Sequence, residues 1–224
     1  CGAVAISQAV LAALPFSPQW RDRLRRAFSR RKGPRELLVA ASRGQAGVTS
    51  DIARLGSLSL VDAAQGVQAE LQRLGVEPVA RTIEDIAARL REKAADVAPD
   101  AAASAALIAY LELSAPVSAS ADVLRGFARE QGLDVATALD AYSERLALIA
   151  KLKPPFWADA TFSAEAGRRF EYYDGFVFEL SREGATDRPI VSGGRYDGLI
   201  TRLSAGTREA SAIGAALRAD RLGG

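Results

Sequence analysis

The feature that most constrains the fold is a change of hydrophobic period near Phe156 and Trp157. Before this point, apolar residues recur at helical spacing, whereas after it aromatic and β-branched residues alternate with polar ones. Short polar connections between the alternating segments favour an antiparallel sheet over repeated βα crossovers. We therefore predict an α+β protein with a helical region at 1–155 and a sheet region at 156–224. The expected strands are residues 161–165, 170–182, 189–192 and 213–217.

Individual helix starts and stops are marked in the first two-thirds of the chain. Ser17 precedes Pro18, which is the usual order of an N-cap and a first helical residue. Ser59 is expected to cap a helix that runs to Gly75, and Thr82 resembles the start of a capping box. Further helices are expected over residues 4–14, 34–44, 83–97, 121–131 and 135–152.

Composition excludes several classes of site. Hydrophobic residues make up 49% and charged residues 25% of the 224 positions, which is typical of a soluble globular protein. The net charge of +2 makes neither nucleic acid nor an anionic membrane the default partner. Without histidine and with one cysteine, the chain cannot build the usual zinc ligand sets, catalytic triads or an internal disulfide. We expect a cytoplasmic protein that needs no metal or cofactor.

The strongest charge run lies at residues 20–35 and is rich in arginine. A phosphate-binding or nucleic-acid-binding surface is one interpretation of this run. Trp20 and Phe28, however, have the spacing of a helix core, and no other aromatic residue interrupts the run. A helix with a solvated or protein-facing basic side is therefore the favoured interpretation, and nucleic acid is not expected as a partner.

Residues 168–179 could supply polar groups to a small-molecule site. Arg168 could bind a carboxylate or phosphate, or be an ordinary surface arginine. Because side chains alternate along a strand, Tyr172 and Tyr173 are expected to point to opposite faces, so that at most one faces a given pocket. Glu171 and Glu179 share a face on the same argument; such pairs can perform acid/base chemistry but are more often solvated.

A second segment, 191–199, contains two adjacent glycines. Gly193 and Gly194 would let a neighbouring backbone or ligand approach closely. Residues 193–198 could form a turn and a helix N-terminus that binds an anion. The alternative is that Asp197 serves only as the cap of that helix.

Together these segments resemble a known family. Residues 168–179, followed by 193–199, resemble the histidine-binding signature of histidyl-tRNA synthetases and of their paralogue, the ATP phosphoribosyltransferase regulatory subunit. Residues 212–222 are similar to motif 3 of class II synthetases, and residues 2–6 and 20–24 are similar to the region after motif 2. The resemblance implies a class II aminoacyl-tRNA synthetase-like antiparallel sheet, of which the C-terminal half is present, with a large helical insertion. Methionine is absent, and we expect a fragment whose upstream motifs are missing.

The resemblance also implies roles for particular residues. Arg168 would approach the carboxylate of histidine or an activated phosphate, and Tyr173 would face the imidazole ring. Tyr172 and Glu171 would line or brace the same pocket. The implied glycine-rich wall consists of Gly193, Gly194 and Arg195.

One departure from the synthetase pattern lies in motif 3. Arg221 matches the arginine that contacts ATP, but Arg218 replaces a glycine, and its side chain would intrude where ATP must pack. This departure, with no anticodon-binding domain before the end at Gly224, favours the non-catalytic regulatory subunit and a vestigial nucleotide site. The resemblance then implies a short-form ATP phosphoribosyltransferase as partner, histidine as ligand and self-association. The alternative is the catalytic core of a histidyl-tRNA synthetase.

Overall fold

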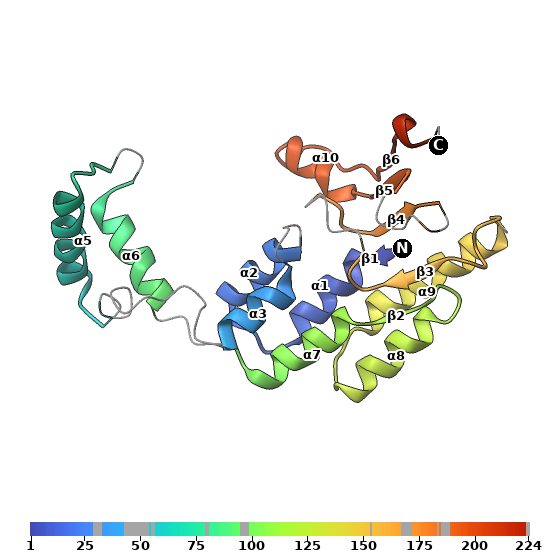
Figure 1. Ribbon diagram of the computed structural model, residues 1–224, viewed down its shortest axis with the longest axis horizontal. Helices are drawn as coiled ribbons and strands as arrows, with labels where there is room; N and C mark the ends of the chain where they lie inside the picture. Colours follow the sequence, from blue (N-terminus) through green and yellow to red (C-terminus); the bar gives the residue numbers. More distant parts are fainter. Residues whose placement is uncertain are drawn as a thin grey trace. The chain divides into compact units, whose positions relative to one another are not determined.

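The structure of the chain is a computed structural model, shown in Figure 1. The chain folds into two compact units, one formed by residues 1–35 and 100–224 and the other by residues 36–99. The boundary that we expected between residues 155 and 156 stays a prediction. The residues described are 1–28, 33–42, 54, 57–78, 81–94, 99–152, 154–166, 172–182, 184 and 189–222.

Helices are present together with antiparallel strands, which confirms the α+β class. Among the described residues, the helices are α1 (Val4–Ala13), α2 (Pro18–Phe28), α3 (Pro34–Ser42), α5 (Leu60–Leu74), α6 (Ile83–Ala94), α7 (Ala101–Leu111), α8 (Ser120–Glu130), α9 (Ala136–Lys151), α10 (Asp197–Leu203) and the 3-10 turn η1 (Ala219–Arg221). The strands are β1 (Gly2–Ala3), β2 (Ser114–Pro116), β3 (Thr161–Ser163), β4 (Phe176–Leu180), β5 (Val191–Arg195) and β6 (Ile213–Leu217).

The main sheet of the first unit is antiparallel, as predicted, and has the order β1-β4-β5-β6. β6 lies where the sequence places it. The strand expected over 170–182 is shorter, because β4 begins only at Phe176. The strand expected over 189–192 is displaced, because β5 continues to Arg195. Strand β1 was not predicted: it has two residues and pairs Gly2 with Val177, too short a stretch to show a period.

A second, two-stranded sheet joins β2 to β3. The strand expected over 161–165 is therefore present, but it pairs with a segment between two helices instead of joining the main sheet. Phe162 on β3 is fully buried, and its ring meets that of Tyr142 from α9 edge-on, with centroids 5.8 Å apart. This contact attaches the small sheet to the helical core.

Two buried hydroxyl pairs lie within that core. The Ser7 hydroxyl is 2.8 Å from that of Tyr110, and the Ser120 hydroxyl is 2.8 Å from that of Tyr142. Each tyrosine can thus be buried with its polar atom satisfied, as a low-dielectric interior requires. These pairs hold α1 to α7 and α8 to α9.

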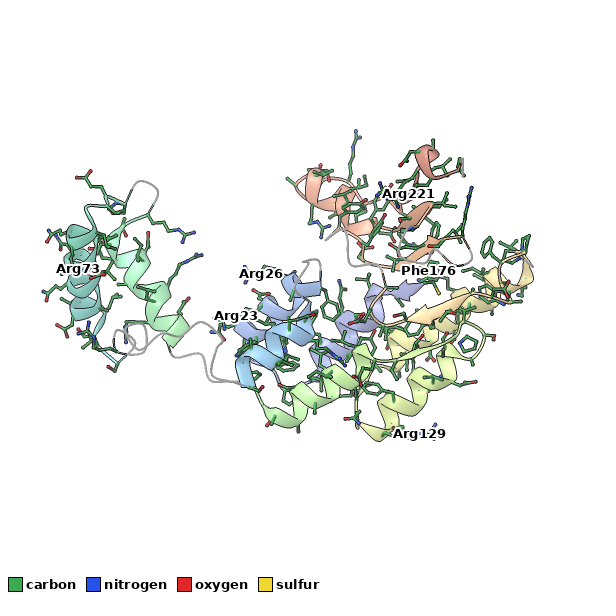
Figure 2. All side chains as sticks on the ribbon, viewed as in Figure 1. Arg23, Arg26, Arg73, Arg129, Phe176 and Arg221 are labelled. Carbon is green, nitrogen blue, oxygen red and sulfur yellow. The ribbon has the colours of Figure 1, made fainter. Side chains whose placement is uncertain are left out.

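Helix α2 shows how the basic run is accommodated. Its Trp20 and Leu24 are buried, whereas Phe28 is half-buried, so the core spacing predicted for Trp20 and Phe28 is confirmed for Trp20 and only in part for Phe28. Part of its basic face is occupied within the helix: the Arg23 guanidinium lies over the Trp20 ring, 5.2 Å from its centroid, and Arg25 pairs with Asp22 at 3.2 Å. Figure 2 shows Arg23 and Arg26 on this helix. Residues 29–32 of the run lie outside the described residues.

The second unit is built on the helix pair α5 and α6, whose boundaries follow the predicted signals. Ser59 accepts the N–H of Asp62 at 3.1 Å, and Thr82 accepts that of Asp85 at 3.1 Å. Gly75 ends α5 with a left-handed φ of 63°. The buried residues of the core between the two helices are Ala63, Val67 and Ala87, and partly buried side chains such as Leu71 and Ile86 pack against them.

No helix in the described part of the chain is both long and apolar enough to cross a bilayer.

Candidate functional site

Three tyrosines form a cluster beside the main sheet. Tyr172 and Tyr173 precede β4, and Tyr196 joins β5 to α10. The centroid of the Tyr172 ring is 4.6 Å from that of the Tyr173 ring. The Tyr172 and Tyr196 rings meet edge-on, with centroids 5.3 Å apart. The prediction that Tyr172 and Tyr173 point to opposite faces is wrong, because strand alternation does not apply before β4 begins at Phe176.

The phenols of the cluster also approach one another. The hydroxyls of Tyr172 and Tyr173 are 3.5 Å apart, and Tyr173 is buried. Burial raises the pKa of Tyr173, and the hydrogen bond to Tyr172 together with the nearby phenols raises it further. Tyr173 is therefore a neutral hydrogen-bonding group at physiological pH, not a base.

The two glycines of the second motif lie in strand β5 and project to opposite sides of the sheet. A Cβ on Gly194 would lie 2.9 Å from ring atoms of Tyr173, so the missing side chain at this position leaves room for the Tyr173 ring against the sheet. A Cβ on Gly193 would instead meet Phe178 and Ala215 at 2.8 Å. The prediction that residues 193–198 begin as a turn is wrong, since the glycines belong to the ladder that pairs β4, β5 and β6.

The helix after this motif is α10, and its cap differs from the expected one. Asp197 is its first residue, and the N–H groups of Asp197 and Gly198 are both accepted by the carboxylate of Asp174, at 3.1 and 2.6 Å. The Asp197 carboxylate accepts instead from Arg195 Nε at 2.7 Å and from the N–H of Ala212 at 2.9 Å. The interpretation of Asp197 as the cap is therefore wrong: Asp174, 23 residues earlier in the chain, has that role.

The charge of Asp197 is stabilised by these contacts. Partial burial alone would raise the pKa of its carboxyl group, but the hydrogen bonds from Arg195 and from the Ala212 N–H, with the arginine charge, lower it. Arg195 also donates to the Ser211 hydroxyl at 3.1 Å. The Arg195 side chain thus holds the segment before β6 instead of projecting freely from the glycine-rich strand.

The two arginines of the proposed nucleotide site lie at the other end of β5. The N–H of Arg218 donates to the carbonyl of Ile190 at 2.8 Å, and Arg221 Nη1 donates to the carbonyl of Pro189 at 2.8 Å; Figure 2 labels Arg221 in this C-terminal turn. The tyrosine cluster lies beside Gly194, which is four residues after Ile190 and therefore roughly 13 Å further along the strand. The two groups are therefore separate along the sheet.

Arg168 and Glu171 lie outside the described residues, and their predicted roles stay predictions. The same holds for the pairing of Glu171 with Glu179, which itself lies on β4 opposite Ser192. Within the described ranges, no group of three or more acidic or cysteine side chains is arranged to hold a metal ion.

Sequence reasoning did not assign a site role to Tyr196 or Asp174. A signal for Tyr196 was its place between Arg195 and Asp197 in the glycine-rich motif. The cap formed by Asp174 leaves no local signal, because the carboxylate and the helix it caps are far apart in sequence.

The sequence of this chain matches the model of a known protein family. The sequence model described as histidyl-tRNA synthetase matches residues 36–222. This chain belongs to the histidyl-tRNA synthetase family. The matched residues include strands β4, β5 and β6 of the antiparallel sheet beside which the tyrosine cluster lies.

Curated relatives of this histidyl-tRNA synthetase family member are similar over most of its length. A protein of Allorhizobium ampelinum named ATP phosphoribosyltransferase regulatory subunit is 34% identical over 228 residues, covering 99% of this chain and 60% of the relative. A protein of the same name from Chelativorans sp. is 35% identical, covering 91% of this chain and 56% of the relative. The chain thus spans about 60% or less of the length of these relatives.

The fold also matches a solved structure. A crystal structure described as an ATP phosphoribosyltransferase regulatory subunit/histidyl-tRNA synthetase from Bacillus halodurans is similar with a TM-score of 0.54 and 21% identity. The match covers 99% of this chain and 42% of that chain. It supports the class II synthetase-like fold predicted from the sequence.

Proposed function

We propose that this chain is part of a regulatory subunit of ATP phosphoribosyltransferase, the enzyme of the first step of histidine biosynthesis. The observation that carries the proposal is the similarity, at 34% and 35% identity over nearly the whole chain, to proteins with that name. The proposal includes a short-form catalytic subunit as partner, self-association and a cytoplasmic location.

The tyrosine cluster is the part of the chain that we propose binds histidine. Stacked and edge-on aromatic rings can hold a planar imidazole, and neutral phenols can hydrogen-bond its nitrogen atoms. Tyr173 has both properties, since it is packed against Tyr172 and its pKa is raised. Arg168 would supply the charge for the histidine carboxylate.

Histidine bound at this cluster would act on the partner only if two states of the assembly bind it with different affinity. The proposed role is therefore that of a sensor: histidine favours the state in which the phosphoribosyltransferase is less active. Arg218, which takes the place of a motif 3 glycine, supports a role without adenylation of histidine.

The test of this proposal is to mix the full-length protein with a short-form ATP phosphoribosyltransferase. We expect a complex by gel filtration, a gain in turnover, and inhibition of the gained activity by histidine. Absence of both a complex and a gain in turnover would contradict the proposal.

The second candidate is the catalytic core of a histidyl-tRNA synthetase, which the description of the matching family favours. It predicts histidine-dependent exchange between ATP and pyrophosphate by the full-length protein. We expect no exchange, because Arg218 carries a long side chain at the end of β6 where the family pattern has a glycine. Exchange in the wild-type protein would favour this candidate.

A further inference from the structure

One carboxylate connects the segment that carries Tyr173 to the start of α10. Asp174 directly follows Tyr173, and its two oxygens accept the N–H groups of Asp197 and Gly198, at 3.1 and 2.6 Å. In the opposite direction, the N–H groups of Asp174 and Gly175 approach the carbonyl oxygen of Arg195, at 3.1 and 3.3 Å. The two segments are therefore joined through both side-chain and backbone groups.

The approach between these segments leaves no room for other side chains. A Cβ on Gly198 would lie 2.8 Å from Asp174 Oδ2, and a Cβ on Gly175 would lie 2.9 Å from the Cβ of Arg195. Real Cβ atoms essentially never come so close to another heavy atom. Both glycines therefore permit the short contacts that Asp174 makes.

Tyr196 lies between the two residues that this joint holds, Arg195 and Asp197. Its N–H donates to the carbonyl of Ala212 at 2.9 Å, and its hydroxyl lies 2.7 Å from the position that a Cβ on Gly214 would take. Its backbone and its ring are thus both fixed against the segment that enters β6. The edge-on contact between Tyr196 and Tyr172 depends on that placement.

We propose that Asp174 is the positioning residue of the tyrosine cluster. By capping α10, its carboxylate sets where Tyr196 stands relative to the two tyrosines before β4. Capping of a helix by an ionised carboxylate is a charge-assisted hydrogen bond that also complements the helix dipole. Asp174 need not touch a ligand, and its effect on histidine affinity rests on the function proposed above.

The five tyrosines of this chain, once their resonances are assigned among those of the full-length protein, allow a direct test. Tyrosine ring-labelled protein is compared by NMR as wild type, Asp174→Asn and Asp174→Ala. Three tyrosines report on the cluster, whereas Tyr110 and Tyr142, buried in the helical core, act as internal controls. The matched control variant is Asp100→Ala, which removes a carboxylate cap from α7, where Asp100 Oδ1 accepts the N–H of Ala103 at 2.8 Å.

We expect Asp174→Ala to shift the ring resonances of the cluster and to leave those of Tyr110 and Tyr142 in place. Asp174→Asn, which keeps one acceptor oxygen, should give smaller shifts, and Asp100→Ala should give none in the cluster. Histidine affinity should fall about tenfold in Asp174→Ala. Unchanged cluster resonances in both Asp174 variants would overturn the proposal.

The arms of this experiment separate the two proposals. A wild-type protein that does not bind histidine contradicts the proposed function, while the resonances still decide whether Asp174 positions the tyrosines. Wild-type affinity in both Asp174 variants contradicts an effect of this positioning on histidine binding and leaves histidine binding itself intact. Should Asp174→Ala fail to fold, the Asp174→Asn comparison decides alone.

Discussion

The ring of Tyr173 fills the space into which a side chain at Gly194 would project. A Cβ on Gly194 would lie 2.9 Å from the Cδ1 and Cε1 atoms of that ring and 2.8 Å from the carbonyl oxygen of Phe176. The cluster can therefore lie directly on the sheet only while residue 194 has no side chain.

Substitution Gly194→Ala is expected to lower the free energy of unfolding by about 1–3 kcal/mol, because overpacking forces the ring or the strand to move. Urea denaturation measures the loss. The control is Gly126→Ala in α8, where an added Cβ has no heavy atom within 4 Å. There we expect stabilisation by about 0.5–1 kcal/mol, as for alanine in a helix interior. Equal effects of the two substitutions would contradict the packing argument.

The buried Tyr142 predicts a loss of stability at high pH. Burial raises its pKa to about 12, although the hydrogen bond with Ser120 lowers it in part. Above the ordinary pKa of 10.0, the unfolded chain loses this proton and the folded chain keeps it, so ionisation favours unfolding. From about pH 10 to pH 12, Tyr142 should reduce the free energy of unfolding by about 1.4 kcal/mol per pH unit.

Substitution Tyr142→Phe isolates this effect. Near pH 8 the variant should be less stable than wild type by about 1 kcal/mol, because it lacks the hydrogen bond to Ser120. The difference should shrink and then reverse as the pH rises from 10 to 12, since the variant has no such proton to lose. Urea denaturation at several pH values measures both proteins, and a constant difference would show that the phenol ionises normally.

The cap of α5 predicts a local effect in the second unit. Substitution Ser59→Ala removes the acceptor of the Asp62 N–H and should destabilise the helix by about 1 kcal/mol. Amide hydrogen exchange should therefore become about fivefold faster in α5. Ser59→Thr keeps a hydroxyl that can accept the Asp62 N–H and donate to the Asp62 carboxylate, and it serves as the control. Exchange in α5 that is equally fast in both variants would contradict the role of the side chain.

Local signals in the sequence predicted several of the helix boundaries. Ser59, Thr82 and Gly75 act through contacts within a few residues, so their chemistry marks a boundary wherever the rest of the chain lies. The antiparallel sheet and the strand β6 were also predicted, because alternation and short connections are themselves local features.

Contacts between distant segments were not predictable in the same way. Strand β4 is shorter than the alternating sequence predicted. Tyr172 and Tyr173 therefore lie before the strand, where side chains need not alternate between faces, and they form one cluster with Tyr196. The cap of α10 comes from Asp174, and no spacing rule connects a carboxylate to a helix 23 residues later. The composition of the candidate site followed from the motifs, but its arrangement required the fold.

The most direct test of the account is a calorimetric titration of histidine into the full-length protein. We expect saturable binding of histidine to the wild-type protein. Tyr173→Phe should bind histidine about tenfold more weakly, because it lacks the phenol that we propose hydrogen-bonds the ligand. Arg168→Ala should show no measurable binding. Tyr110→Phe should keep wild-type affinity, because it removes a buried hydroxyl that is hydrogen-bonded to Ser7 and does not belong to the tyrosine cluster. Absence of binding to wild type, or equal affinity in wild type, Tyr173→Phe and Arg168→Ala, would contradict a histidine site at the tyrosine cluster.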